Sequence, residues 1–165
     1  RGIALALNAA PSDLYLGAAA NERNVKTVDL SNRRVVMVAT HGLIPGDLNG
    51  LLQPALALSA PNVADIDGDG LLTLDEVLGL KLNADWVVLS ACNTATGDGA
   101  GAEAVSGLGR AFFYAGTRAL LVSNWPVETT SARALTTDLF ARQARDANLA
   151  RAAALQQAML GLLDG

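Results

Sequence analysis

Three short runs of β-branched and aliphatic residues punctuate the chain. They are VVMVAT at 35–40, DWVVLSA at 85–91 and RALLVSN at 118–124. Because their apolar residues are continuous rather than alternating, each run predicts a strand buried on both faces, as in a parallel sheet. Between the last two runs, apolar residues of 101–116 recur at helical spacing, and Gly116 provides a stop for that helix. The pattern therefore predicts a strand–helix–strand unit and an α/β fold.

The remaining segments predict smaller elements around this unit. Residues 129–163 mix alanine, leucine and charge at helical spacing, which predicts two helices packed on the sheet, with a break near Asn148. The sequence NERNVKTV at 21–28 predicts a short helix, and IALAL at 3–7 predicts an edge strand. Residues 42–64 place three prolines and three glycines around one apolar segment, which predicts a loop or hairpin inserted after a strand.

Composition supports this picture and excludes several classes of protein. A chain of 165 residues with 51% hydrophobic residues predicts one domain with a single core. A net charge of -4 without a basic stripe argues against a nucleic-acid partner, which needs clustered Lys and Arg. The apolar runs fall far short of the roughly 18 residues that span a bilayer, so no membrane partner is expected.

The ends and the cysteine content indicate the setting of the chain. The start, RGIALALNAAP, has too short an apolar run for a signal peptide. Because the chain begins at Arg1 without a methionine, we expect a piece of a longer protein. A lone cysteine forms no internal disulfide, so no oxidising compartment is implied and a cytoplasmic location is expected.

The only histidine and the only cysteine follow two of the predicted strands. His41 comes directly after the first run, and Cys92 directly after the second. Because the carboxyl ends of parallel strands open onto one crevice, both residues are expected at the same edge of the sheet. An imidazole there can take the thiol proton and return it to a leaving amine. Gly42, which has no Cβ, leaves room for its N–H to act with that of Cys92 as an oxyanion hole.

Each residue also has a plain structural interpretation. A free cysteine at a strand end is often core, and a lone histidine is often a hydrogen-bonded interior residue. Together, however, His41 and Cys92 occupy equivalent strand ends, with the histidine about 50 residues upstream. That order is typical of caspases and disfavours papain-like enzymes and class I amidotransferases, in which the cysteine comes first.

Several segments in combination resemble a known family. VVMVATHG, GLLTLDEV, ADWVVLSACNTATG, GLGRAFFYAGTRALLVSNWPV and the closing alanine-rich helix pair are similar to the CHAT domain. This is a bacterial branch of the caspase-like cysteine peptidases related to separase, and the similarity runs from about Leu16 to the C-terminus. The resemblance implies a three-layer sandwich with helices on both faces of a mostly parallel sheet. It also implies a catalytic His41–Cys92 dyad that hydrolyses peptide bonds of protein substrates through a thioester.

The same resemblance suggests partners and a substrate pocket. It implies no organic cofactor, and a tetratricopeptide or other regulatory module elsewhere in the parent chain. The loop after LLVSN would line the pocket for the substrate side chain, which makes Trp125 and Glu128 candidate substrate-binding residues. An acid there favours Arg or Lys in the substrate. Alternatively, Trp125 is a core aromatic and Glu128 an acid favoured near the start of a helix.

A second motif, DIDGDGLLTLDE at 65–76, fits the calcium-loop pattern at every defined position. Gly70 would supply the sharp turn, and the candidate ligands are Asp65, Asp67, Asp69, the Leu71 carbonyl, Thr73 through water, and Glu76. Alternatively, Thr73 and Glu76 form a capping box that opens a helix running to Lys81, and the CHAT family carries a similar segment without metal. The motif thus leaves two functions open: a calcium-modulated peptidase, or a catalytically inactive signalling or scaffold module with a structural calcium loop.

Overall fold

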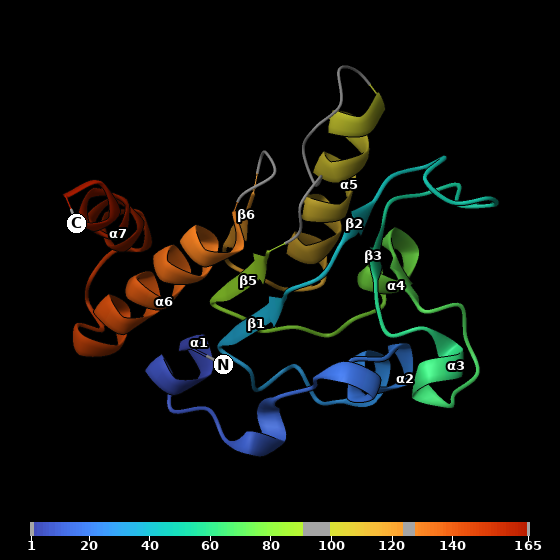
Figure 1. The fold of residues 1–165 in the computed structure, drawn as a ribbon, viewed down its shortest axis with the longest axis horizontal. Coiled ribbons are helices and arrows are strands. Elements are labelled where there is room, and N and C mark those ends of the chain that lie inside the picture. The colour runs from blue at the N-terminus through green and yellow to red at the C-terminus, as the bar shows by residue number, and fades with distance from the viewer. Residues whose placement is uncertain (1, 91–99, 124–127, 165) are drawn as a thin grey trace. The chain divides into compact units, whose positions relative to one another are not determined.

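The computed structural model describes residues 2–90, 100–123 and 128–164 (Figure 1). The chain forms two compact units, and each is described by itself. The first unit combines Arg1–Tyr15 with Val127–Gly165, and the second is Leu16–Pro126.

A parallel sheet runs through the second unit. Its strands are β1 (Val35–Val38), β5 (Trp86–Leu89) and β6 (Leu120–Val122), in the order β1-β5-β6, with both pairings parallel (Figure 1). The central strand β5 is buried at all four positions, as its continuous apolar run predicts. The three predicted strands and their parallel arrangement are therefore confirmed. The predicted burial on both faces holds only for β5, because β1 and β6 are half-buried and Met37 of β1 is exposed.

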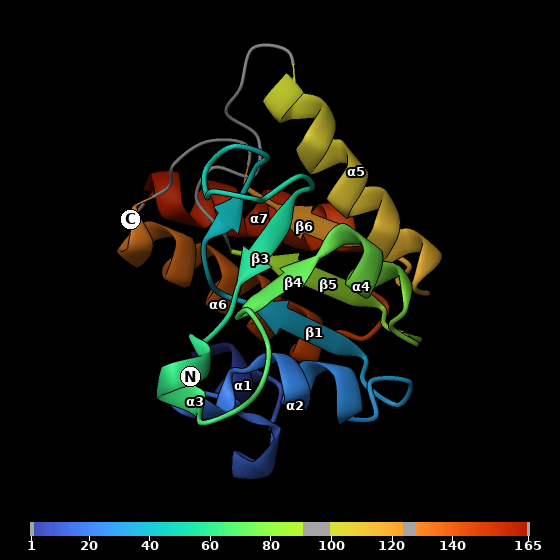
Figure 2. The same ribbon diagram turned by 90° about the vertical axis from the view of Figure 1, so that its right-hand side faces the viewer.

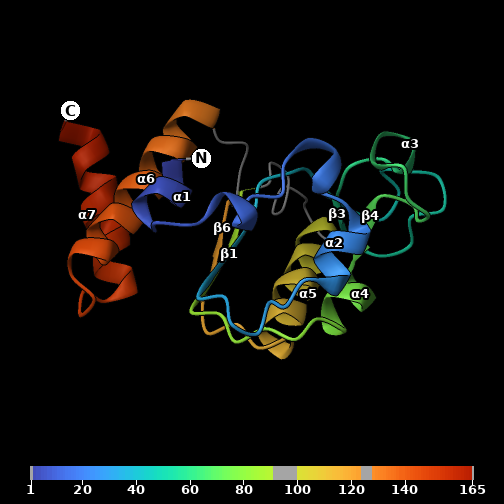
Figure 3. The same cartoon turned by 90° about the horizontal axis from the view of Figure 1, so that it is seen from below.

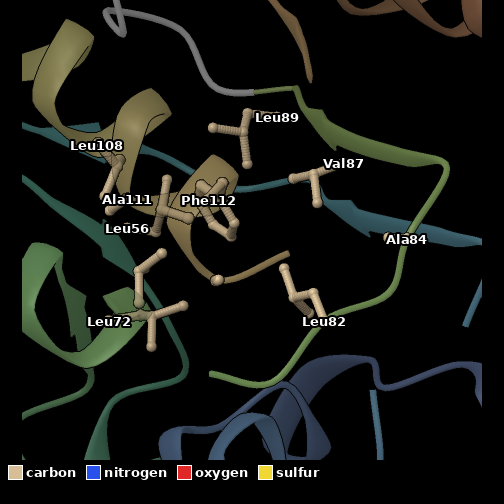
Figure 4. Close-up of a cluster of buried hydrophobic side chains, with 11 residues drawn as sticks. Leu56, Leu72, Leu82, Ala84, Val87, Leu89, Leu108, Ala111 and Phe112 are labelled. Carbon is tan, nitrogen blue, oxygen red and sulfur yellow. The ribbon is translucent and has the colours of Figure 1, made fainter. Parts of the chain in front are cut away.

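Helix α5 (Ala100–Tyr114) joins β5 to β6 and packs on the core of this unit. Gly116 follows it with a φ of +112°, and a Cβ there would run into the carbonyl oxygen of Leu82. Only glycine fits this stop, as predicted. Figure 4 shows the core cluster around this helix. The buried members of the cluster are Leu56, Leu72, Val77, Leu82, Ala84, Val87, Leu89, Leu108, Ala111, Phe112 and Ala115.

An antiparallel sheet follows β1 along the chain. It is built from β2 (Gly42–Leu43), β3 (Ala55–Ala57) and β4 (Leu71–Thr73) in the order β2-β3-β4 (Figure 2). The predicted hairpin is therefore confirmed, while β4 was not predicted. Two short helices flank β4, namely α3 (Pro61–Ala64) before it and α4 (Leu74–Leu78) after it.

Polar caps open two helices of this unit. Helix α2 (Glu22–Thr27) begins after Asn21, whose side chain accepts a hydrogen bond from the Asn24 N–H, which confirms the predicted short helix. A 3-10 turn at Gly17–Ala19 precedes it. The predicted capping box of Thr73 and Glu76 opens α4, but the helix ends at Leu78 rather than at Lys81.

The first unit is helical. Helix α6 (Thr129–Arg145) packs against both α1 (Gly2–Ala6) and α7 (Arg151–Asp164), as Figure 3 shows, and a 3-10 turn lies at Pro11–Asp13. The two predicted C-terminal helices and the break between them are confirmed.

The edge strand predicted at 3–7 is wrong, because Gly2–Ala6 is helix α1. Alanine and leucine have high helix propensity, and Ile3 is the only β-branched residue of the segment. The helix buries Ile3 and leaves Leu5 79% exposed, so one side of the segment packs inward. Apolar runs this short do not distinguish a helix from a strand.

Within the described ranges, no helix combines the length and the apolar character that crossing a membrane requires.

Candidate active site

His41 lies just beyond the carboxyl end of β1. Its backbone carbonyl accepts a hydrogen bond of 2.9 Å from the Ala57 N–H, and the hydroxyl of Thr40 donates to the Ala57 carbonyl. The neighbouring strand β3 therefore fixes the backbone at this point. The residue is exposed, and its imidazole has no hydrogen bond or ion pair to any other described residue. The alternative of a hydrogen-bonded interior histidine is therefore wrong.

The register of the parallel sheet relates His41 to the second predicted catalytic residue. Val38 lies opposite Leu89, and the Ser90 N–H donates to the Val38 carbonyl at 3.0 Å. His41 follows Val38 by three residues, and Cys92 follows Leu89 by the same number. Cys92 itself lies outside the described residues. The described strands thus end side by side, each three residues before one member of the predicted dyad.

Gly42 begins β2, which lies at an edge of the described antiparallel sheet. It faces Leu56 across the ladder, while the flanking hydrogen bond joins Ala57 to His41. Because bonded and non-bonded pairs alternate in an antiparallel ladder, the Gly42 N–H points away from β3. Gly42 itself is buried, and its role as an oxyanion donor stays a prediction.

The two predicted substrate-binding residues differ in what the structure shows of them. Trp125 lies outside the described residues. Glu128 is the N-cap of α6, where its carboxylate accepts hydrogen bonds from the N–H groups of Thr130 at 2.8 Å and Ser131 at 2.7 Å. These backbone bonds lower the pKa of Glu128 from 4.5 to about 2. Glu128 thus caps a helix, as the alternative proposed, and a role of Glu128 in substrate binding stays a prediction.

Glu76, the last carboxylate of the calcium-loop motif, is hydrogen-bonded to other groups of this chain. One oxygen of Glu76 accepts from the N–H and hydroxyl of Thr73 at 2.8 and 2.9 Å, and the other lies 2.5 Å from the Lys26 ammonium. Burial raises the pKa of Glu76, but the hydrogen bonds from Lys26 and Thr73 outweigh it and lower the pKa overall. Asp69 accepts from the N–H of Leu71 at 2.8 Å.

The other candidate ligands are not gathered around a common point. Asp65 ends helix α3 with a left-handed φ of 52°, and Asp67 follows in the loop. Throughout the part of the chain that the structure describes, no three His, Cys, Asp or Glu side chains form a group that could hold a metal ion. Calcium binding therefore stays a prediction, with a capping box observed at Thr73 and Glu76.

Comparison with known families now adds to this geometry. The sequence profile of the CHAT domain matches residues 2–165. The chain belongs to the CHAT family. The resemblance is thereby confirmed, and the match begins at Gly2 rather than at about Leu16. The CHAT domain is related to caspase-like cysteine peptidases, a relationship that fits the mixed α/β fold with its parallel sheet. No curated protein matches the chain.

Two residues of this CHAT domain that contact the calcium-type loop were not predicted from the sequence. Glu22 is buried, and one of its oxygens accepts from the N–H groups of Asp69 and Gly70, each at 3.2 Å. Lys26 lies 2.5 Å from the other oxygen, and its hydrogen bonds with Glu22 and then Glu76 raise its pKa. The spacing of Glu22 and Lys26 on one helix indicates that they pair. No local sequence signal indicates that Glu22 contacts the loop at Asp69 and Gly70.

Proposed function

We propose that this CHAT domain is a cysteine endopeptidase in which His41 and Cys92 form the catalytic dyad. The observation that carries the proposal is the parallel register of β1 and β5. It places Val38 opposite Leu89, three residues before each member of the pair. The exposure of His41 and its lack of a described partner support this role, because a general base must be accessible to the nucleophile and the substrate.

The proposed reaction has two stages. His41 takes the proton of the Cys92 thiol, and the thiolate sulfur attacks the carbonyl carbon of the peptide bond. The C–N bond then breaks, the leaving amine takes the proton from the imidazolium, and a thioester to Cys92 remains. Water, deprotonated by the imidazole, attacks this thioester. The C–S bond breaks, a carboxylic acid leaves, and the thiol is restored.

The negative charge on the carbonyl oxygen needs hydrogen-bond donors. The Gly42 N–H, which points away from β3, is the proposed first donor; the Cys92 N–H is the proposed second. Glycine at 42 allows close approach, because no Cβ stands between the substrate and the backbone.

The proposal also includes a three-layer architecture and a pocket for the substrate side chain. Helix α5 packs against the core beneath the parallel sheet, and helices on the other face would complete a three-layer caspase-like sandwich. Trp125 and Glu128 are the proposed contacts of the substrate side chain, with Arg or Lys favoured. A Glu128→Gln variant removes the negative charge of this side chain. Comparing cleavage of a peptide library by the variant and by the wild type tests the preference for Arg or Lys.

Labelling by a cysteine-directed peptidyl probe tests the dyad. With Cys92 as the only thiol, the probe reports on a single sulfur. We expect labelling of the wild-type chain, no labelling of Cys92→Ala, and at least a hundredfold slower labelling of His41→Ala, the scale of a lost general base. Lys81→Gln is the control, because Lys81 is exposed and has no hydrogen bond or ion pair to another described residue.

The alternative function makes the opposite prediction. In an inactive signalling or scaffold module, Cys92 reacts no faster than a free thiol, and His41→Ala labels at the wild-type rate. Cleavage of a peptide library, measured with and without calcium, separates the two functions independently of the probe. Absence of both cleavage and accelerated labelling in the intact parent protein would overturn the peptidase proposal.

A further inference from the structure

A lysine ammonium lies between two carboxylates at the calcium-type loop. The Nζ of Lys26 lies 2.5 Å from an oxygen of Glu22 and 2.5 Å from an oxygen of Glu76. Glu22 and Lys26 share helix α2, whereas Glu76 belongs to α4, so the ammonium joins two helices that are 50 residues apart in the chain.

The Glu22 end of this bridge holds the loop itself. Its second oxygen accepts from the N–H groups of Asp69 and Gly70, so one carboxylate contacts both the loop backbone and the ammonium. Glu22 is only 8% exposed, and a buried carboxylate is costly without a positive partner. Gly68 makes room for it, because a Cβ at that position would run into the Glu22 carboxylate.

The Glu76 end of the bridge involves the residue that a calcium loop uses as its bidentate ligand. Both of its oxygens are engaged, one by Thr73 and the other by Lys26. A calcium ion bound by both oxygens would have to displace the ammonium and break the capping box of α4. Two of the candidate carboxylate ligands, Asp69 and Glu76, are therefore engaged by groups of this chain.

Backbone hydrogen bonds connect this loop to the candidate active site. The Gly70 carbonyl accepts from the Leu58 N–H at 2.7 Å. The preceding residue, Ala57, donates its N–H to the His41 carbonyl at 2.9 Å. Two adjacent residues at the end of β3 thus contact the loop on one side and His41 on the other.

We propose that the Lys26 ammonium is the resident cation of the calcium-type loop: by bridging Glu22 and Glu76 it orders residues 65–70 without a metal ion and so positions the backbone of His41. Lys26 is a positioning residue, since it acts on His41 through the loop and β3. Only the catalytic consequence of this positioning rests on the proposed function.

Thermal unfolding tests whether Lys26, rather than a calcium ion, stabilises the loop. After treatment with a chelator, millimolar calcium should change the Tm of the wild-type chain no more than magnesium at equal ionic strength. Lys26→Gln should lower the Tm by roughly 3 to 8 °C, because it leaves the buried Glu22 carboxylate uncompensated. Lys26→Arg should recover at least half of that loss, and Lys81→Gln, at an exposed lysine, should leave the Tm unchanged.

The outcomes that contradict the proposal are specific. A rise in the wild-type Tm with calcium but not magnesium would overturn it, and this arm needs no variant. Equal Tm values for Lys26→Gln and Lys81→Gln would also overturn it.

The positioning of His41 has its own readout, which does not depend on activity. Because His41 is the only histidine, its ring gives one set of NMR signals in the full chain. Those signals should move in Lys26→Gln, return toward wild type in Lys26→Arg, and stay unchanged in Lys81→Gln. If the signals move but the chain cleaves nothing, the peptidase proposal fails alone. Should cleavage be observed while Lys26→Gln leaves the His41 signals unmoved, the positioning fails alone.

Discussion

The two sheets of the second unit share one hydrophobic core but differ in the polar contacts around their strands. In the parallel sheet, the central strand β5 is buried at every position, and the valines and leucines of the strands pack on α5. Its charged contacts lie at the amino end, where Asp85 pairs with Arg34 at 2.8 Å and Arg118 at 3.3 Å. These arginines are mostly exposed, so burial of apolar surface dominates there.

The antiparallel sheet has strands of only two or three residues, and side-chain hydrogen bonds surround it. The Thr40 hydroxyl donates to β3, and Gln53 exchanges two hydrogen bonds of 3.1 Å with Asp75. Glu22 holds the loop before β4, and Lys26 joins it to α4. Leu56 of β3 and Leu72 of β4 are buried in the core cluster as well, so polar contacts at the strand ends act together with burial in this sheet.

The two members of the proposed dyad therefore depend on different parts of the fold. Cys92 follows a strand that burial places, whereas the backbone of His41 is bonded to a sheet that polar side chains brace. Substitutions in the core should therefore affect global stability, and substitutions in the polar network should mainly affect the His41 side.

The largest expected effect is at Phe112, which is 1% exposed in the core cluster. Phe112→Ala should reduce the free energy of unfolding by about 3–5 kcal/mol through lost burial and a cavity. Chemical denaturation measures it, and Phe112→Leu should retain most of the stability. The proposed contrast between the sheets would fail if Phe112→Ala cost no more than a capping variant of α4.

That capping variant is Thr73→Ala, which removes the hydroxyl that donates to Glu76 and leaves the backbone N–H bond to the same oxygen in place. We expect a loss of about 1 kcal/mol in the free energy of unfolding, the usual cost of a lost N-cap. Thr73→Ser keeps the hydroxyl and should remain close to wild type. An equal loss in both variants would show that the methyl group, rather than the cap, matters.

A smaller effect is expected at the charged end of the parallel sheet. Asp85→Asn should cost about 0.2–1 kcal/mol, because both arginine partners are exposed to solvent. The difference from wild type should shrink in molar salt, which screens exposed pairs. A salt-independent loss of several kcal/mol would mean that charge, not burial, holds this sheet.

The smallest effect concerns the cap of α6 in the first unit, and it depends on pH. Hydrogen bonds lower the pKa of Glu128 in the folded chain to about 2 from 4.5, so the carboxylate stabilises the fold above pH 4.5. That contribution should be lost as the pH falls toward 2. Thermal unfolding of wild type and Glu128→Gln across this range should therefore converge at low pH, while Glu128→Asp, which keeps the cap, should follow wild type.

Much of the second unit could be predicted from local sequence. Continuous apolar runs predicted the three parallel strands, helical spacing predicted α5, and the spacing of Thr73 and Glu76 predicted a capping box, which the structure confirms. The segment at 3–7 was predicted wrongly, because a short apolar run suits a strand or a helix and its packing within the unit decides. The loop at 65–76 illustrates a deeper limit, since its carboxylates match a calcium pattern whatever lies beside them.

Residue type and spacing along the chain were enough to predict the three parallel strands, helix α5, the family and the order of histidine and cysteine. Which side chains meet depends on the folded chain. It placed Lys26 between two carboxylates from separate helices, and it bonded His41 to β3 rather than burying it. Charge partners and ladder neighbours are selected by distance in space, and residues 50 apart in the chain become neighbours only after folding.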